Sequence, residues 1–130
     1  MKSYPYFPAR ELVCKCGNCD GGQMNDLFMN KLVGMRFLAD FPFPLSSAFR
    51  CPAHNDVVSS SGLDGPHTTG RTVDIRVYGP RALRVLELAA MAGMTGIGVQ
   101  QNGPHSSRFI HLDDLLDGET SGPRPWVWTY

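Results

Sequence analysis

Asp74 lies inside a short apolar segment, residues 72–77, whose alternating pattern predicts a β-strand. A carboxylate at such a position is costly to bury unless it pairs with a cation or coordinates a metal. Seven residues earlier stands His67, on a loop that leads into the strand, and Gly70 lets the backbone turn between them. Taken singly, each residue also fits a plainer role: an ion pair with an arginine for Asp74, and a solvated loop position for His67.

A second histidine, His111, lies within another apolar segment, residues 108–112, which also predicts a strand. A polar ring among apolar neighbours needs a partner. Two histidines and one carboxylate form a common catalytic zinc set, because three protein ligands leave the fourth position open for water. The sequence therefore indicates a zinc hydrolase with His67, Asp74 and His111 as the metal ligands. Asp113 shares a strand face with His111, and would either bind the other ring nitrogen of a ligand or hold the catalytic water.

The bulk composition limits the alternatives. A chain of 130 residues suffices for one domain with one core, so we expect a single domain over residues 1–130. Twelve basic and twelve acidic residues cancel, which argues against nucleic acid or an anionic membrane as a partner. No apolar run approaches the roughly 20 residues that span a bilayer. The first residues lack the apolar core of a secretory signal, so we expect synthesis in the cytoplasm.

Four cysteines stand out: Cys14, Cys16 and Cys19, which lie within six residues, and Cys51. Without a secretory signal, such a cluster indicates metal binding or reduced thiols more readily than a disulfide framework. The C-x-C-x-x-C spacing loosely resembles a zinc knuckle, to which Cys51 would add the fourth thiolate. A structural metal site at these four residues, reduced thiols and disulfides all remain open at this point.

The remaining pattern predicts an α+β domain. We expect residues 1–23 to be an irregular, cysteine-rich segment. Helical spacing predicts helices over 24–40, with Phe28, Leu32, Met35 and Leu38/Ala39 on its inner face, and over 81–91, with Leu83, Leu86 and Ala90 inside. Residues 51–58 predict a turn or a short helix. Strands are expected at 45–49, 72–77, 96–99 and 108–112, with a last one carrying Trp126, Trp128 and Tyr130. Two or three helices would pack on a small, mostly antiparallel sheet.

Several of these segments form a joint pattern with His67, Gly70, Asp74 and His111. Residues 45–55 end a strand with Phe49-Arg50 and continue with a proline and an asparagine, and Gly96-Ile97-Gly98-Val99 and the closing Trp-x-Trp-x-Tyr follow later. From about residue 8 to its end, the chain resembles the zinc D-alanyl-D-alanine carboxypeptidase family, whose motif is S-x-H-x-x-G-x-A-x-D with a later His. That family shares its fold with the signalling domain of Hedgehog. The segment Gly96-Ile97-Gly98-Val99 and the closing Trp126-x-Trp128-x-Tyr130 fit the compact subgroup found in phages and bacteria.

The resemblance implies a Hedgehog/DD-peptidase-like fold and a role for each matching residue. His67, Asp74 and His111 would bind Zn²⁺, and Arg50 would reach the carboxylate or the carbonyl oxygen of the substrate, a task that suits its planar charged fork. The implied activity is hydrolysis of peptide bonds in peptidoglycan stem peptides or crosslinks, by a monomer. A phage endolysin or a virion-associated enzyme acting at the cell wall would fit.

The chain departs from the family pattern at three positions. Gly65 replaces the serine two residues before the first ligand, and Thr72 replaces the alanine. The third departure is Arg108, which stands three residues before His111, where many members carry an acidic general base.

A peptidase must move a proton from the attacking water to the leaving amine. In place of Arg108, the sequence offers Asp113, His105 and Asp114, of which Asp113 is the first choice. His105, in the preceding loop, would act as the acid or stabilise the oxyanion, or is simply solvated. The missing acid also supports an alternative function, a non-catalytic zinc-containing module that binds cell wall or protein. A virion structural protein that keeps the fold is a third reading.

Overall fold

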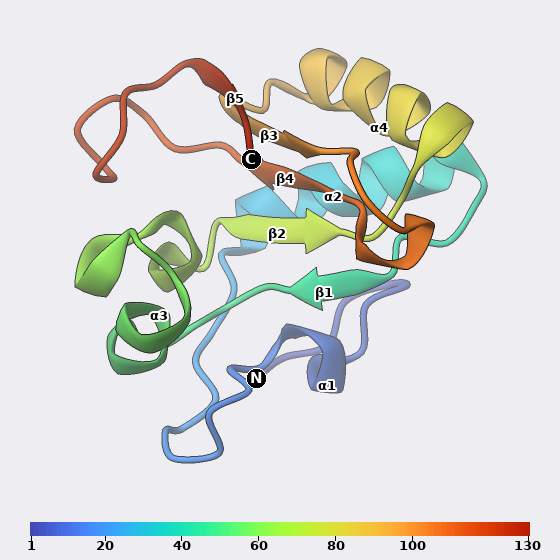
Figure 1. Cartoon of the computed structure of the whole chain (residues 1–130). Helices are drawn as coiled ribbons and strands as arrows, with labels where there is room; N and C mark the ends of the chain where they lie inside the picture. Colours follow the sequence, from blue (N-terminus) through green and yellow to red (C-terminus); the bar gives the residue numbers. More distant parts are fainter.

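The computed structural model describes residues 1–130 as a five-stranded sheet with two long helices on one side (Figure 1). The strand order is β1-β2-β4-β3-β5; only β3 and β5 run parallel, and the other neighbours are antiparallel. The predicted α+β architecture and its mostly antiparallel sheet are confirmed. The strands are β1 (Leu45–Ser47), β2 (Thr72–Ile75), β3 (Gly96–Gln100), β4 (Phe109–Asp113) and β5 (Trp126–Thr129).

Helix α2 (Asp26–Ala39) forms close to where its sequence pattern predicts it. The Asn25 side chain caps its first turn by accepting a hydrogen bond of 2.9 Å from the backbone N–H of Phe28. The helix ends at Asp40, which adopts the left-handed conformation with φ of 58°. Phe28, Leu32 and Met35 are buried, as their spacing predicts, and Ala39 is partly buried, but Leu38 was placed wrongly and is 57% exposed.

Helix α4 (Gly79–Ala92) packs beside α2 on the same side of the sheet (Figure 1). The residues expected on its inner face were wrong: Leu83 is 63% exposed, and the buried residues are Ala82, Val85, Leu88 and Ala89. The helix carries two apolar stripes, and the stripe with Ala82, Val85, Leu88 and Ala89 is the one that joins the apolar core.

The shorter helices lie away from this layer. Helix α1 (Ala9–Leu12) interrupts the N-terminal segment that we expected to be irregular, and its Leu12 is fully buried. Helix α3 (Pro52–Val58) follows β1 and is succeeded by two 3-10 turns, Gly62–Asp64 and Pro66–Thr69. A third such turn is His105–Ser107. No helix of the structure, α2 and α4 included, is both long and apolar enough to traverse a bilayer.

The two faces of the sheet have different chemistry. Val73, Ile75, Ile110 and Leu112 are fully buried and belong to the apolar core with the α2 and α4 side chains. Because side chains alternate along a strand, the residues between them point to the opposite face. There the cross-strand register aligns one residue from each strand in a single row: Ser47, Asp74, His111, Gly98 and Trp128.

Two glycines of β3 make room on this polar face. A Cβ at Gly98 would lie 2.7 Å from the indole of Trp128 and 2.9 Å from the hydroxyl of Tyr130. A Cβ at Gly96 would overlap the carboxylate of Asp113, its partner in the register. The G-x-G pattern of β3 therefore lets bulky and charged side chains from β4 and β5 lie flat across the strand.

Replacing Gly96 with alanine should lower the free energy of unfolding by about 1–3 kcal/mol, because the clamped Asp113 carboxylate has to move. Gly34 provides the control, since it lies in α2 with nothing within 4 Å of an added Cβ. There the same change should stabilise the protein by about 0.5–1 kcal/mol. Urea unfolding of both variants measures the difference, and equal effects would contradict this role of Gly96.

Candidate metal centre

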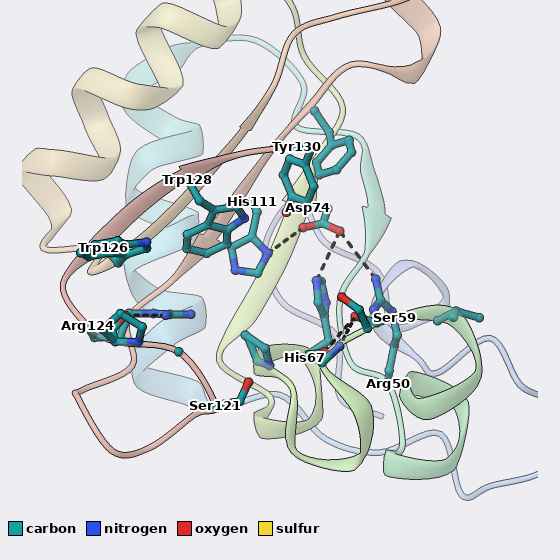
Figure 2. Close-up of a pocket in the computed structure, with 17 residues that line it drawn as sticks. Arg50, Ser59, His67, Asp74, His111, Ser121, Arg124, Trp126, Trp128 and Tyr130 are labelled. Carbon is teal, nitrogen blue, oxygen red and sulfur yellow. Dashed lines mark hydrogen bonds and ion pairs between the residues drawn. The ribbon is translucent and has the colours of Figure 1, made fainter.

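The structure brings His67, Asp74 and His111 together on the polar face of the sheet. The Asp74 carboxylate lies between the two imidazoles: Oδ2 is 3.3 Å from Nε2 of His67, and Oδ1 is 3.0 Å from Nδ1 of His111 (Figure 2). One ligand atom from each residue lies within 4.8 Å of the others, and all three residues are buried. Asp74 and His111 meet because they are partners in the β2–β4 register, whereas His67 arrives from the 3-10 turn before β2.

The nitrogens on the far side of both rings are held by acceptors. Nδ1 of His67 lies 2.7 Å from the carbonyl oxygen of Ala48, and Nε2 of His111 lies 2.8 Å from Oδ2 of Asp113. A carbonyl oxygen only accepts, so Nδ1 of His67 carries a proton. The ring nitrogens that face Asp74 then hold lone pairs whenever the rings are neutral. Two lone pairs and a carboxylate turned toward one point are a donor set that a divalent cation fits.

The electrostatics keep Asp74 ionised. Burial alone would raise the pKa of this carboxyl group, but the neighbouring His67 and His111 outweigh burial and hold its pKa well below the usual range. The carboxylate is therefore present as an anion across the physiological range, as a metal ligand requires.

Arg50 lies at the edge of the same group of residues. Its Nε donates to Oγ of Ser47 at 3.0 Å, and its Nη1 donates to Oδ1 of Asn55 at 2.9 Å. Its Nη2 lies 3.7 Å from Oδ2 of Asp74, so that this carboxylate contacts Arg50 as well as His67 and His111 (Figure 2). The guanidinium is thus oriented by two neutral partners, Ser47 and Asn55, and lies beside the Asp74 carboxylate.

Asn55 explains the glycine at position 65. It is fully buried in α3 and donates to Oγ of Ser61 at 3.0 Å and to the carbonyl oxygen of Gly62. A Cβ at Gly65 would overlap Oγ of Ser61 and the amide nitrogen of Asn55. The serine of the family pattern has no space here, because Asn55 and Ser61 occupy its place.

Asp113 lies beneath His111 and is completely buried. Besides His111, its carboxylate accepts two hydrogen bonds from Arg124, at 2.9 Å from Nε and 2.8 Å from Nη2. Burial raises the pKa of Asp113, but the hydrogen bonds from His111 and Arg124 outweigh burial and lower this pKa to about 2. A carboxylate with this pKa is a weak base near neutrality. Its contacts suit the first role considered for it, that of holding the far nitrogen of a metal ligand.

The other candidates for proton transfer lie elsewhere. His105 stacks on Tyr78, with 4.1 Å between the ring centroids, and does not line the pocket at the ligands. Asp114 is bound by Lys31 and Arg71 at 2.9 and 2.8 Å. Arg108 donates from Nε to the carbonyl oxygen of Gly103 and is also outside the pocket.

His67, Asp74 and His111 line a pocket of about 490 Å³. Its walls come from the α3 region, from the segment before β5 and from β5 itself, which contributes Trp126 and Trp128 (Figure 2). Trp128 packs against His111 with 4.8 Å between ring centroids, and the guanidinium of Arg124 lies 5.1 Å from the centre of the Trp128 ring system. Sequence reasoning missed Arg124, although the signal existed: Asp113, a second carboxylate at the end of an apolar strand, requires a cation.

The four cysteines also meet in space, as a separate group whose Sγ atoms lie within 4.8 Å of one another. None of them lines the pocket at His67, Asp74 and His111.

Replacing Arg124 with methionine should lower the free energy of unfolding by about 3 kcal/mol, because Asp113 would remain buried without its main cation. The same variant should bind zinc about 10- to 100-fold more weakly, since Asp113 orients His111. Arg84 is the control: it forms a surface pair with Glu87 at 3.8 Å, and its change to methionine should cost less than about 0.5 kcal/mol. Urea unfolding and zinc competition with a chelator measure both effects, and similar values for the two variants would refute this assignment.

A comparison with known families identifies the family of this chain. The sequence profile of the Peptidase M15 family matches residues 5–113, a span that contains Arg50, His67, Asp74 and His111 and ends before β5. A comparison with curated proteins finds no match. The family is zinc-dependent, and the donor set described above fits that metal. The chain therefore belongs to Peptidase M15, the family of zinc D-alanyl-D-alanine carboxypeptidases.

Proposed function

We propose that this protein is a zinc-dependent peptidase that hydrolyses peptide bonds in peptidoglycan stem peptides or crosslinks. The observation that carries the proposal is the geometry of His67, Asp74 and His111, whose donor atoms converge at the floor of an open pocket. Zinc bound by three such ligands lowers the pKa of a bound water to about 7 and polarises a carbonyl group. The roles of the surrounding side chains follow from their contacts.

Arg50 would bind the carboxylate or the carbonyl oxygen of the peptide. Both of its anchoring partners, Ser47 and Asn55, are neutral, so its charge is shared only with Asp74 at 3.7 Å. Arg124, the other arginine in the pocket, already donates two hydrogen bonds to the carboxylate of Asp113. Arg50 is therefore the better anchor for an anionic peptide end.

The wall opposite Arg50 is aromatic and comes largely from β5. Trp128 and Tyr130 lie on it, and Phe109 packs on Tyr130 with 5.0 Å between ring centroids. Such a wall suits small apolar side chains, and the alanine side chains of peptidoglycan stem peptides are of this kind. This match of size supports the substrate class.

The pocket offers few groups for proton transfer. The pocket contains no carboxylate except that of Asp74. Asp113, the first choice from the sequence, is better placed to hold His111, and His105 would have to leave Tyr78 to reach the reacting atoms. The pKa of Tyr130, which lines the pocket, is raised by burial to about 12, so its hydroxyl is protonated and would serve only as a donor.

The lack of a second carboxylate that could act as the general base in the pocket favours a second candidate function, a zinc-containing module that binds cell wall or protein without cleaving it. Turnover of purified peptidoglycan separates the two functions, because zinc binding without product release indicates a binding module. Within the peptidase proposal, the resemblance to the compact subgroup supports a phage endolysin or a virion-associated enzyme that acts at the cell wall.

Changing His67 or Asp74 to alanine should remove one zinc ion per chain and reduce release of peptidoglycan fragments by at least about 1,000-fold, because the reaction then lacks its Lewis acid. His54, which lies in α3 outside the pocket, is the matched control, and His54→Ala should retain both metal and activity. Elemental analysis and a fragment-release assay are the measurements. Full activity in the His67 and Asp74 variants would end the peptidase proposal.

Changing Arg50 to lysine should raise KM about 10- to 100-fold with a smaller effect on kcat, because lysine keeps the charge but loses the two-pronged hydrogen bonding. A synthetic stem peptide with a free carboxylate and its amide should be compared. If Arg50 binds the terminal carboxylate, the wild-type protein should discriminate between them and the variant should not. Arg108→Lys, outside the pocket, is the control and should leave KM unchanged.

A further inference from the structure

The cysteine cluster is formed by two separate parts of the chain. Cys14, Cys16 and Cys19 come from the irregular segment after α1, and Cys51 is the residue that precedes the first turn of α3. The four Sγ atoms lie within 4.8 Å of one another and none forms a disulfide. This arrangement joins the N-terminal segment to the end of the loop that carries Arg50.

The spacing of the sulfurs matches a metal site. The Sγ atoms of Cys16 and Cys51 are 3.8 Å apart. Four thiolates at about 2.3 Å from a tetrahedral zinc ion lie about 3.8 Å from one another, whereas a disulfide brings two sulfurs to about 2.05 Å. A tetrahedron of thiolates therefore requires little movement of these side chains.

Backbone amides point at three of the sulfurs. The N–H groups of Asn18, Gly21 and Cys51 donate to the Sγ atoms of Cys16, Cys19 and Cys14, each at 3.3 Å. Gly17, with φ of 72°, has nothing within 4 Å of an added Cβ, so the turn needs its glycine for the backbone conformation alone. Amide donation stabilises a thiolate over a thiol, and such hydrogen bonds accompany metal ligands in proteins.

Apolar burial does not account for the cluster. Cys14 is buried, but Cys16 and Cys51 are only partly covered and Cys19 is exposed. Residues 13–25 contain no helix or strand. Thiols that are in contact with water gain little free energy by clustering. The convergence of three cysteines from the irregular segment with Cys51 therefore indicates a common binding partner.

We propose that Cys14, Cys16, Cys19 and Cys51 bind a structural Zn²⁺ ion, separate from the site at His67, Asp74 and His111. Four thiolates fill a tetrahedral ion and leave no position for water or substrate, so this site is structural. Its function is to fasten the N-terminal segment to residues 49–51.

The neighbouring contacts show what this fastening would hold. A Cβ at Gly22 would overlap the ring of Phe49, so the cysteine segment lies directly against the loop before α3. The N–H of Arg50 donates to the carbonyl oxygen of His67 at 3.0 Å. The ion would thus fix the backbone on one side of Arg50, while the turn that carries His67 fixes it on the other.

The test is a zinc count on chains purified under reducing conditions. The wild-type protein should carry two zinc ions, and the double variants His67→Ala/Asp74→Ala and Cys16→Ser/Cys19→Ser one each. Asn18→Ala, an exposed change between two of the cysteines, is the control and should carry two. Loaded with Co²⁺, the His67/Asp74 variant should show the sulfur-to-metal charge-transfer bands of a tetrathiolate site, and the cysteine variant should not.

The wild-type chain alone also decides the question if the cysteine variant fails to fold. A mercurial reagent that titrates thiolates should release one zinc ion per chain, and all four thiols should resist alkylation until it is removed. Loss of that ion should lower the melting temperature by about 5 °C or more. A single zinc ion per chain with four reactive thiols, an intact mass that shows disulfides, or an unchanged melting temperature would overturn the proposal.

Discussion

The carboxylate of Asp74, held between two imidazoles, is the interaction around which the functional face of the sheet is built. It lies on β2, between β1 and β4, and its row in the register continues through His111 and Gly98 to Trp128. A slip of one residue in the β2–β4 pairing would send His111 to the apolar side and Ile110 or Leu112 to the polar side. The apolar core on α2 and α4 therefore protects the site, because any such slip would expose fully buried side chains.

A second carboxylate extends this arrangement beyond the ligands themselves. His111 lies between Asp74 and Asp113, and Arg124 balances the charge of Asp113 from the segment before β5. Trp128 then covers His111. Arg124 and Trp128 follow the span that the family profile matches. Residues 114–130 therefore supply part of the wall and of the electrostatic support of a site whose candidate ligands His67, Asp74 and His111 lie within the matched span.

The loop from Ala48 to Cys51 contacts both the group of His67 and Asp74 and the cysteine cluster. The carbonyl oxygen of Ala48 orients His67, the side chain of Arg50 faces Asp74, and the N–H of Cys51 donates to the sulfur of Cys14. A displacement of this loop would disturb His67, Arg50 and the cysteine cluster at once. This dependence gives the irregular N-terminal segment a physical reason to be fastened.

From the sequence alone, most helices and strands could be located, and His67, Asp74 and His111 could be named as candidate metal ligands. Strand alternation marked Asp74 and His111 as polar groups that need partners, and helical spacing identified the buried residues Phe28, Leu32 and Met35 of α2 but not the exposure of Leu38. The inner face of α4 and the cation beside Asp113 were decided by tertiary structure, because both depend on which surfaces meet. Period alone cannot choose between two apolar stripes, and Arg124 lies 11 residues from the carboxylate it binds. Only the folded chain shows that Asp113 is already paired, that His105 stacks elsewhere and that four cysteines converge, since each is a fact of distance and not of sequence order.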